Sequence, residues 1–110
     1  MNEDSGCSGG EVFALRVLGH DMAPEFNDGE IIVIEPDGRV QDGSFVLAEL
    51  DDGFTFRQLG RGAAGGWVLR ALNPAPGQPA ERPLPDLAAV RGVIIQKAVP
   101  GRRRLSKSYL

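Results

Sequence analysis

The chain has 110 residues, with 12 Lys and Arg against 15 Asp and Glu, 42% hydrophobic residues and a single Cys. This length predicts one small domain with its own core, and one Cys excludes an internal disulfide and a four-cysteine zinc site. The longest apolar run, residues 31–34, is far short of the roughly 18 residues that cross a bilayer, and no signal peptide opens the chain. We therefore expect a soluble, cytoplasmic protein.

The charge is unevenly distributed, because four of the basic residues lie in the last ten positions: Arg102, Arg103, Arg104 and Lys107. Residues 1–100 carry eight basic and fifteen acidic residues, a formal charge of −7. Such an acidic body excludes broad binding of nucleic acid, which needs a basic face. The basic tail, residues 101–110, is either a solvated, disordered end or a contact for an acidic partner, for the acidic body of a second copy or for a nucleic-acid backbone.

The first half of the chain predicts a loose arm followed by short strands. Residues 1–10 are mostly small and polar and show no hydrophobic periodicity. From residue 12 to 18 the alternation places Phe13, Leu15 and Val17 on one face, which predicts a half-buried strand. Residues 22–26 allow one helical turn at most, and residues 30–35 predict a strand buried on both faces.

The second half predicts hairpins and one long loop. Two apolar runs, residues 45–50 and 54–59, are joined by Asp51-Asp52-Gly53 and predict a β-hairpin. Residues 60–66 predict a glycine-rich turn and residues 67–72 the returning strand. Five prolines between residues 74 and 85 predict an extended surface loop. Residues 90–99 predict the last strand, and only residues 85–90 allow another helical turn, so the fold class is mainly β.

A motif links these elements to a known family. The segment Gly19-His20-Asp21-Met22-Ala23-Pro24 resembles the Gly-x-Ser-Met-x-Pro motif of the LexA, UmuD and phage-repressor self-cleaving serine peptidases. The later segments DGEIIVIEP, VQDGSFVLAEL, DDGFTFRQL, LRALNP and VRGVIIQ resemble their strands in the same order. This resemblance covers residues 12–99 and implies a LexA/signal-peptidase-like fold of coiled antiparallel sheets, with residues 11–100 as the peptidase-fold domain.

Both catalytic residues of that family are replaced. Its nucleophilic serine matches Asp21, and its lysine base matches Arg57, after Thr55 and Phe56. The chemistry needs a hydroxyl and a neutral amine that accepts its proton, and a guanidinium with a pKa above about 12 cannot serve as that base. One carboxylate does not make the two-carboxylate site of an aspartic protease. We therefore expect a pseudo-peptidase, with the alternative that Ser44 acts as a relocated nucleophile.

If the fold is kept, Asp21 and Arg57 should face each other and form a charge-assisted pair. The other interpretation is that both residues lie independently in solvent. Gly19, Met22 and Pro24 keep the family motif. Only 20 residues precede Asp21 in this sequence, so we expect neither the family's cleavage segment nor its winged helix-turn-helix here.

The resemblance implies action by association. Family members dimerise partly along the closing strand, so Val93, Ile94, Ile95, Gln96 and Lys97 are the candidate dimer surface. The implied partner is a second copy or a related regulator, and the implied context is SOS-type or phage-type transcriptional regulation. A nucleic-acid-contacting module acting through the tail is the other alternative.

The remaining polar and aromatic residues predict no further chemistry. Cys7 is interpreted as an unpaired, exposed thiol, His20 as structural or solvated, and the aspartates of the turns as turn formers. The aromatic residues Phe54, Phe56 and Trp67 are expected in the core or at a dimer surface. No cluster has the spacing of metal ligands, and we expect neither a metal nor a cofactor.

Overall fold

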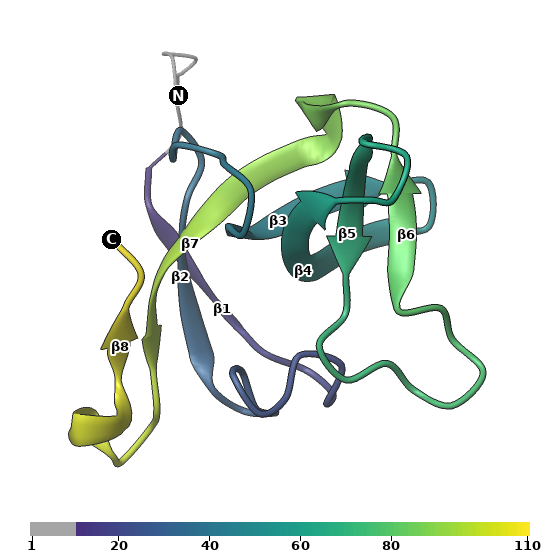
Figure 1. Cartoon of the computed structure of the whole chain (residues 1–110). Coiled ribbons are helices and arrows are strands. Elements are labelled where there is room, and N and C mark those ends of the chain that lie inside the picture. The colour runs from purple at the N-terminus through teal and green to yellow at the C-terminus, as the bar shows by residue number, and fades with distance from the viewer. Residues whose placement is uncertain (1–10) are drawn as a thin grey trace.

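A computed structural model of the protein describes residues 11–110 (Figure 1). Within these residues it contains β1 (Phe13–Arg16), β2 (Ile31–Glu35), β3 (Phe45–Leu50), β4 (Gly53–Arg61), β5 (Trp67–Arg70), β6 (Glu81–Leu84), β7 (Val90–Ala98) and β8 (Lys107–Ser108). Two single 3-10 turns complete the described part, η2 (Leu87–Ala89) and η3 (Arg103–Leu105). The predicted mainly β class is confirmed. No helix within residues 11–110 is long and apolar enough to span a bilayer.

The strands form one antiparallel sheet in the order β1-β2-β7-β3-β4-β5-β6, and β8 is added to β7. The predicted hairpin is β3–β4, closed at Leu50 and Gly53. Gly53 has a φ of +115°, a conformation that glycine adopts without strain, and the local Asp-Asp-Gly sequence therefore specifies this turn.

β3 and β7 lie between two hydrophobic clusters, because successive side chains of a strand point to opposite faces. Leu47 and Ile94 belong to the first cluster, with Phe26 and Ile34. Val46 and Val93 belong to the second cluster, with Leu59, Leu69 and Leu84. The central strands are thus buried on both faces, which explains their continuous apolar sequence.

β1 differs from its prediction. The strand ends at Arg16, and Phe13 and Leu15 remain 38% and 41% exposed although Val17 is buried. β1 is the end strand of the sheet, and Leu15 lines an open hollow between β1 and β4. The expected half-buried strand is therefore wrong for these two side chains.

The proline-rich segment differs as well, because its second half forms β6 and pairs with β5. Pro83 lies in this strand, opposite Val68. A proline lacks the N–H that a central strand needs, but β6 has a neighbour on one side only, so the missing donor costs no ladder bond.

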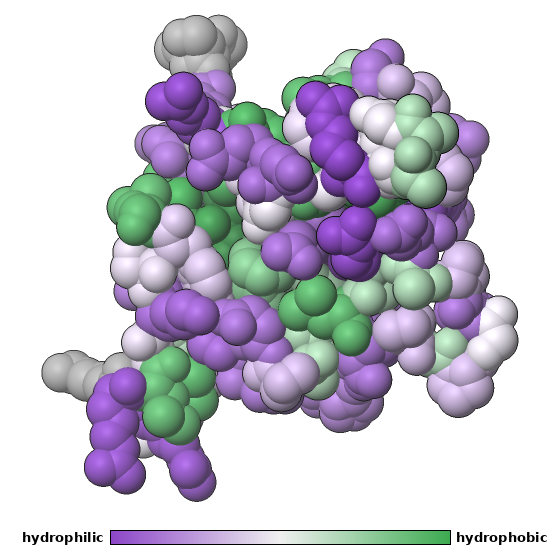
Figure 2. All heavy atoms as spheres, viewed as in Figure 1, coloured by the Kyte–Doolittle hydropathy of each residue, from purple (hydrophilic) through white to green (hydrophobic). Residues whose placement is uncertain are grey.

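The basic tail is also part of the sheet. Lys107 and Ser108 form β8 and pair with Lys97 and Gln96 of β7. In Figure 1 this segment lies at the lower left, and in Figure 2 the same corner is a projection of hydrophilic atoms around a hydrophobic centre. Of the two interpretations of the tail, the disordered end does not hold for Lys107 and Ser108, which form this strand. The loose arm predicted for residues 1–10 lies outside the described residues.

Candidate functional site

Asp21 begins a compact turn between β1 and β2. The N–H of Ala23 donates to the carbonyl of His20 at 3.1 Å, and the N–H of Phe26 donates to that of Met22 at 2.9 Å. The structure assigns turns and no helix to residues 21–25, within the limit of one helical turn at most that the sequence sets. Met22 is only 2% exposed and anchors the turn in the core.

Two contacts fix the ends of this turn. Gly19 has a φ of +87°, and its N–H donates to Oδ1 of Asp28 at 2.7 Å. The carbonyl of Asp21 accepts from the N–H of Asn73 at 2.8 Å. Pro24 follows a cis peptide bond at the exposed side of the turn. The motif residues Gly19, Met22 and Pro24 thus all lie in the segment that positions Asp21.

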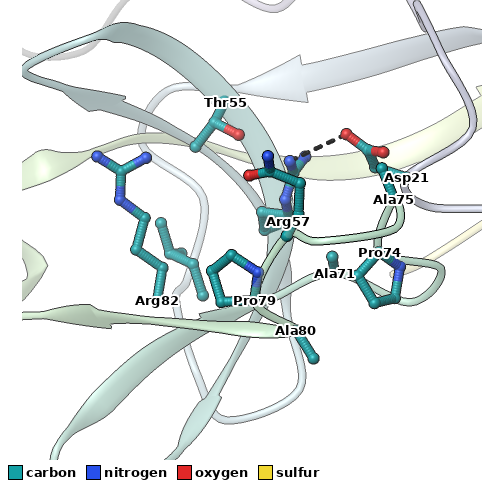
Figure 3. Close-up of a pocket in the computed structure, with 11 residues that line it drawn as sticks. Asp21, Thr55, Arg57, Ala71, Pro74, Ala75, Pro79, Ala80 and Arg82 are labelled. Atoms are coloured by element: carbon teal, nitrogen blue, oxygen red, sulfur yellow. Dashed lines mark hydrogen bonds and ion pairs between the residues drawn. The ribbon is translucent and has the colours of Figure 1, made fainter.

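Arg57 comes from β4 and points toward this turn (Figure 3). Its Nη2 lies 3.2 Å from Oδ2 of Asp21 and donates a hydrogen bond to it, and its Nη1 donates to the carbonyl of Phe56 at 2.7 Å. The predicted contact between Asp21 and Arg57 is confirmed as one hydrogen-bonded ion pair. The side chains are 27% exposed for Arg57 and 45% for Asp21, so the pair is partly solvated.

The ion pair borders two hollows of the surface. One has a volume of about 210 Å³ and lies under the proline-rich loop, with Pro74, Pro79 and Arg82 in its wall (Figure 3). The other has a volume of about 370 Å³ and lies between β1 and β4. Asp21, Thr55 and Arg57 line both hollows. The pair therefore stands at the boundary between them.

A second polar cluster holds the other end of the same turn. The Nζ of Lys97 donates to the carbonyl of Glu25 and lies 3.5 Å from Oε1 of Glu30. Glu30 also accepts from the N–H of Asn27 at 3.0 Å. The side chains of Lys97 and Glu30 are each only 11% exposed. This buried pair fastens the turn to β7.

The tail reaches the same turn through Glu25. Lys107 Nζ donates to Glu25 Oε2 at 2.8 Å, and the Tyr109 hydroxyl donates to the same oxygen. These bonds, first that from Lys107 and then that from Tyr109, hold the pKa of the Glu25 carboxyl below its usual value. Burial, followed by the contact with Glu25, raises the pKa of the Tyr109 phenol. The tyrosine ring also packs on Phe26 at 5.3 Å between ring centroids.

The sequence did not indicate this cluster. The one available signal was Lys97, a charged residue within a strongly apolar strand and one of the two lysines of the chain. Tyr109 and Lys107 gave no signal, because their contacts depend on how the tail folds back along β7.

The candidate dimer surface is largely enclosed within the chain. Val93, Ile94 and Lys97 are buried, Ile95 is half-buried and Gln96 is exposed. One edge of β7 pairs with β2, and the other pairs with β3 and then β8. The carbonyl of Ile95 accepts from the N–H of Tyr109 at 2.9 Å. Both edges of β7 are therefore paired within the chain, and the dimer surface at this strand stays a prediction.

The other residues singled out lie apart from the ion pair. His20 is exposed, and Ser44 Oγ accepts from the N–H of Gln41 at 3.1 Å in the turn before β3. Trp67 packs against the second cluster, with the Arg61 guanidinium 3.7 Å from its ring centroid. Cys7 lies outside the described residues.

The tail cations are divided between two environments. Lys107 is engaged by Glu25, whereas Arg102, which precedes η3, and Arg104, which lies in it, are exposed. The side chain of Arg103 lies outside the described residues. Across the part of the chain that the structure covers, no three His, Cys, Asp or Glu side chains gather as a metal site would require.

A family model agrees with this fold and motif. The model described as Peptidase S24-like matches residues 2–95, which is most of the chain and includes both Asp21 and Arg57. The protein belongs to the Peptidase S24-like family.

Proposed function

We propose that the protein is a catalytically inactive member of this family that acts by association rather than by cleavage. The observation that carries the proposal is the 3.2 Å ion pair between Asp21 and Arg57. By resemblance, these residues stand where the family has its nucleophilic serine and its lysine base. An acid and a guanidinium keep a contact at this place but supply neither a nucleophilic hydroxyl nor a base that accepts its proton.

The lysines of the chain support inactivity further. The sequence has two, Lys97 and Lys107. Lys97 donates to the carbonyl of Glu25 and pairs with Glu30, and Lys107 pairs with Glu25. Among the described residues, both amines contact oxygen atoms of Glu25 or Glu30 rather than a serine hydroxyl, which argues against a relocated Ser/Lys dyad.

The alternative nucleophile, Ser44, is held in a turn. Its hydroxyl oxygen accepts from Gln41, and its backbone carbonyl accepts from the N–H of Leu59 at 2.7 Å. These bonds give Ser44 a structural task and point to no base. The likeness to LexA and UmuD suggests SOS-type or phage-type transcriptional regulation as the setting, with a second copy or a related regulator as the partner.

A cleavage assay tests the proposal. The full chain is incubated at alkaline pH with itself and with peptide substrates of active family members, one of which serves as a positive control. We expect the masses of protein and peptide to remain unchanged. Cleavage that Ser44→Ala abolishes would establish the relocated nucleophile, and cleavage that Asp21→Ala abolishes would show that the replaced site is active. Either result overturns the proposal.

A further inference from the structure

The connection between β7 and β8 carries three consecutive arginines, Arg102, Arg103 and Arg104. Arg102 and Arg104 are exposed, and neither joins an ion pair with another residue that the structure describes. No Asp or Glu occurs between residues 99 and 110. The connection is therefore a concentration of positive charge that the described part of the fold does not neutralise.

Backbone hydrogen bonds fix the shape of this connection. The N–H of Arg102 donates to the carbonyl of Val99 at 2.9 Å, and the N–H of Leu105 donates to that of Arg102 at 2.9 Å. Across the base of the turn, the N–H of Val99 donates to Oγ of Ser106 at 3.3 Å. We call residues 99–106 the arginine turn. Its backbone is held in one arrangement, so a ligand does not have to order a loose chain before it binds.

The arginine turn lies at the edge of the molecule, where β7 and β8 end (Figure 1). Figure 2 shows hydrophilic atoms that extend outward at the same corner. β8 is fastened to the body through Glu25, which accepts from Lys107 at 2.8 Å and from the Tyr109 hydroxyl. This contact uses the charge of Lys107 inside the protein, so the arginines supply the positive charge that a partner meets.

The chemistry of the arginine turn fits phosphate groups. A guanidinium donates parallel hydrogen bonds from a rigid fork and is more weakly hydrated than an ammonium, so it suits phosphate oxygens. Double-stranded DNA carries one negative charge for about every 1.7 Å of its axis, and its major groove admits a two-stranded ribbon. A narrow turn with adjacent arginines can therefore reach phosphates while the wider body stays outside.

A membrane surface fits the arginine turn less well. Leu105, which is 48% exposed, is the one large hydrophobic side chain that the turn exposes, and η3 has only three residues. Binding of a protein in the plane of a membrane surface needs the larger apolar face of an amphipathic helix.

An acidic protein segment also fits less well. Residues 1–100 carry a formal charge of −7 and repel any polyanion. DNA offsets this repulsion because it releases condensed counterions when arginines neutralise its phosphates. A protein segment has fewer charges for its length and supplies this effect more weakly.

We propose that the arginine turn binds the phosphate backbone of double-stranded DNA through Arg102 and Arg104, with a third arginine between them in the sequence. This inference goes beyond the proposed function and does not depend on the loss of catalysis. Backbone contacts carry no sequence information, so duplexes of different sequence should bind equally. Two or three phosphate contacts predict a slope of log K against log salt concentration between about −1.8 and −2.7.

The test is the binding of the full chain to a labelled DNA duplex, measured by fluorescence anisotropy at several salt concentrations. We expect a dissociation constant of about 10⁻⁵–10⁻⁴ M in low salt. The double variant Arg102→Gln with Arg104→Gln should raise this constant about 10-fold or more and make the slope shallower by about 1 for each arginine. Both side chains are exposed, so the variant should keep the fold.

The matched control is the double variant Arg82→Gln with Arg91→Gln. It removes the same charge from two exposed side chains, one on β6 and one near the start of β7, at the opposite end from the arginine turn. Charges farther from the DNA than a Debye length are largely screened. The dissociation constant of the control should therefore stay within about 3-fold of the wild type, with an unchanged slope.

A measurement on the wild type needs no variant. Addition of the duplex should shift the amide NMR signals of residues 101–106, because these residues form the proposed contact. The amide signals of β4 and β5, which lie on the other side of β3, should stay in place.

A chain that binds no duplex in low salt overturns the inference, as does binding that Arg102→Gln with Arg104→Gln leaves unchanged or that shifts β4 and β5 instead. Tighter binding to vesicles of anionic lipid or to polyglutamate than to the duplex would also overturn it, because the partner would then be a membrane surface or an acidic protein segment. None of these results bears on the cleavage assay, which tests the proposed function separately.

Discussion

At the residue scale, the contact between Asp21 and Arg57 should add little to the stability of the fold. The pair is partly exposed and makes one hydrogen bond between the two side chains, and such pairs contribute about 0–1 kcal/mol. We expect Asp21→Ala to lower the free energy of unfolding in urea by less than about 1 kcal/mol. The control is Glu49→Ala, which removes an exposed pair with Arg91 at 3.1 Å. A much larger loss for Asp21 alone would contradict this estimate.

The ion pair between Lys97 and Glu30 is buried and should therefore matter much more for stability than the exposed pair of Asp21 and Arg57. Both side chains are almost fully buried, and removal of one partner leaves the other charge without compensation. We expect Lys97→Met to cost about 3–5 kcal/mol in urea unfolding, and the double variant Lys97→Met with Glu30→Leu to recover part of that loss. Arg91→Met, at an exposed pair, is the control. Equal stabilities for Lys97→Met and the control would contradict the prediction.

At the element scale, the close approach of β7 to β2 depends on Gly92. A Cβ at this position would lie 2.4 Å from Cγ2 of Ile34 and 3.3 Å from the carbonyl oxygen of Glu35. We expect Gly92→Ala to destabilise the fold by about 1–3 kcal/mol, since the packed strands must move apart. Gly66→Ala is the matched control, because a Cβ there meets nothing within 4 Å. Thermal unfolding of the two variants measures the difference, and equal melting temperatures would contradict it.

The contacts of Lys107 and Tyr109 with Glu25 predict that the attachment of β8 to the fold weakens at acidic pH. The pKa of Glu25 is lowered first by Lys107 and then by Tyr109, so the charged carboxylate stabilises the fold above the usual pKa of a glutamate. This contribution disappears as the pH falls through the lowered pKa of the folded state. We expect Glu25→Gln to accelerate amide exchange in β8 at neutral pH and to match the wild type only once the pH lies below the lowered pKa of the folded state.

The control for that experiment is Glu49→Gln, whose carboxylate pairs with Arg91 away from the tail. It should leave exchange in β8 unchanged at either pH. An equal effect of Glu25→Gln at neutral and acidic pH would exclude the carboxylate charge as the attachment.

Local chemistry made some of these elements predictable and left others hidden. The β3–β4 hairpin followed from Asp51-Asp52-Gly53, and the Asp21–Arg57 contact followed from the two positions that match the family's serine and lysine. β6 was missed because its prolines exclude a central strand but allow an end strand, a distinction that depends on the neighbours. β8 was missed because its order comes from Glu25, a residue distant in the sequence.

At the scale of the whole molecule, β3 and β7 make the two hydrophobic clusters interdependent. Val46 and Leu47 are adjacent in the sequence but lie in different clusters, as do Val93 and Ile94. Neither cluster can lose these strands while the other keeps its packing. The chain should therefore unfold as one cooperative unit.

This cooperativity can be tested with the single tryptophan. Phe26 is fully buried in the first cluster, with ring centroids 4.9 Å from Phe45 and 4.8 Å from Phe56. Trp67 packs against the second cluster and reports its unfolding by fluorescence. We expect Phe26→Leu to cost about 1–3 kcal/mol and to shift the urea midpoint of Trp67 fluorescence as far as that of circular dichroism. A Trp67 transition that stays in place while the dichroism shifts would mean that the clusters unfold independently, despite the strands they share.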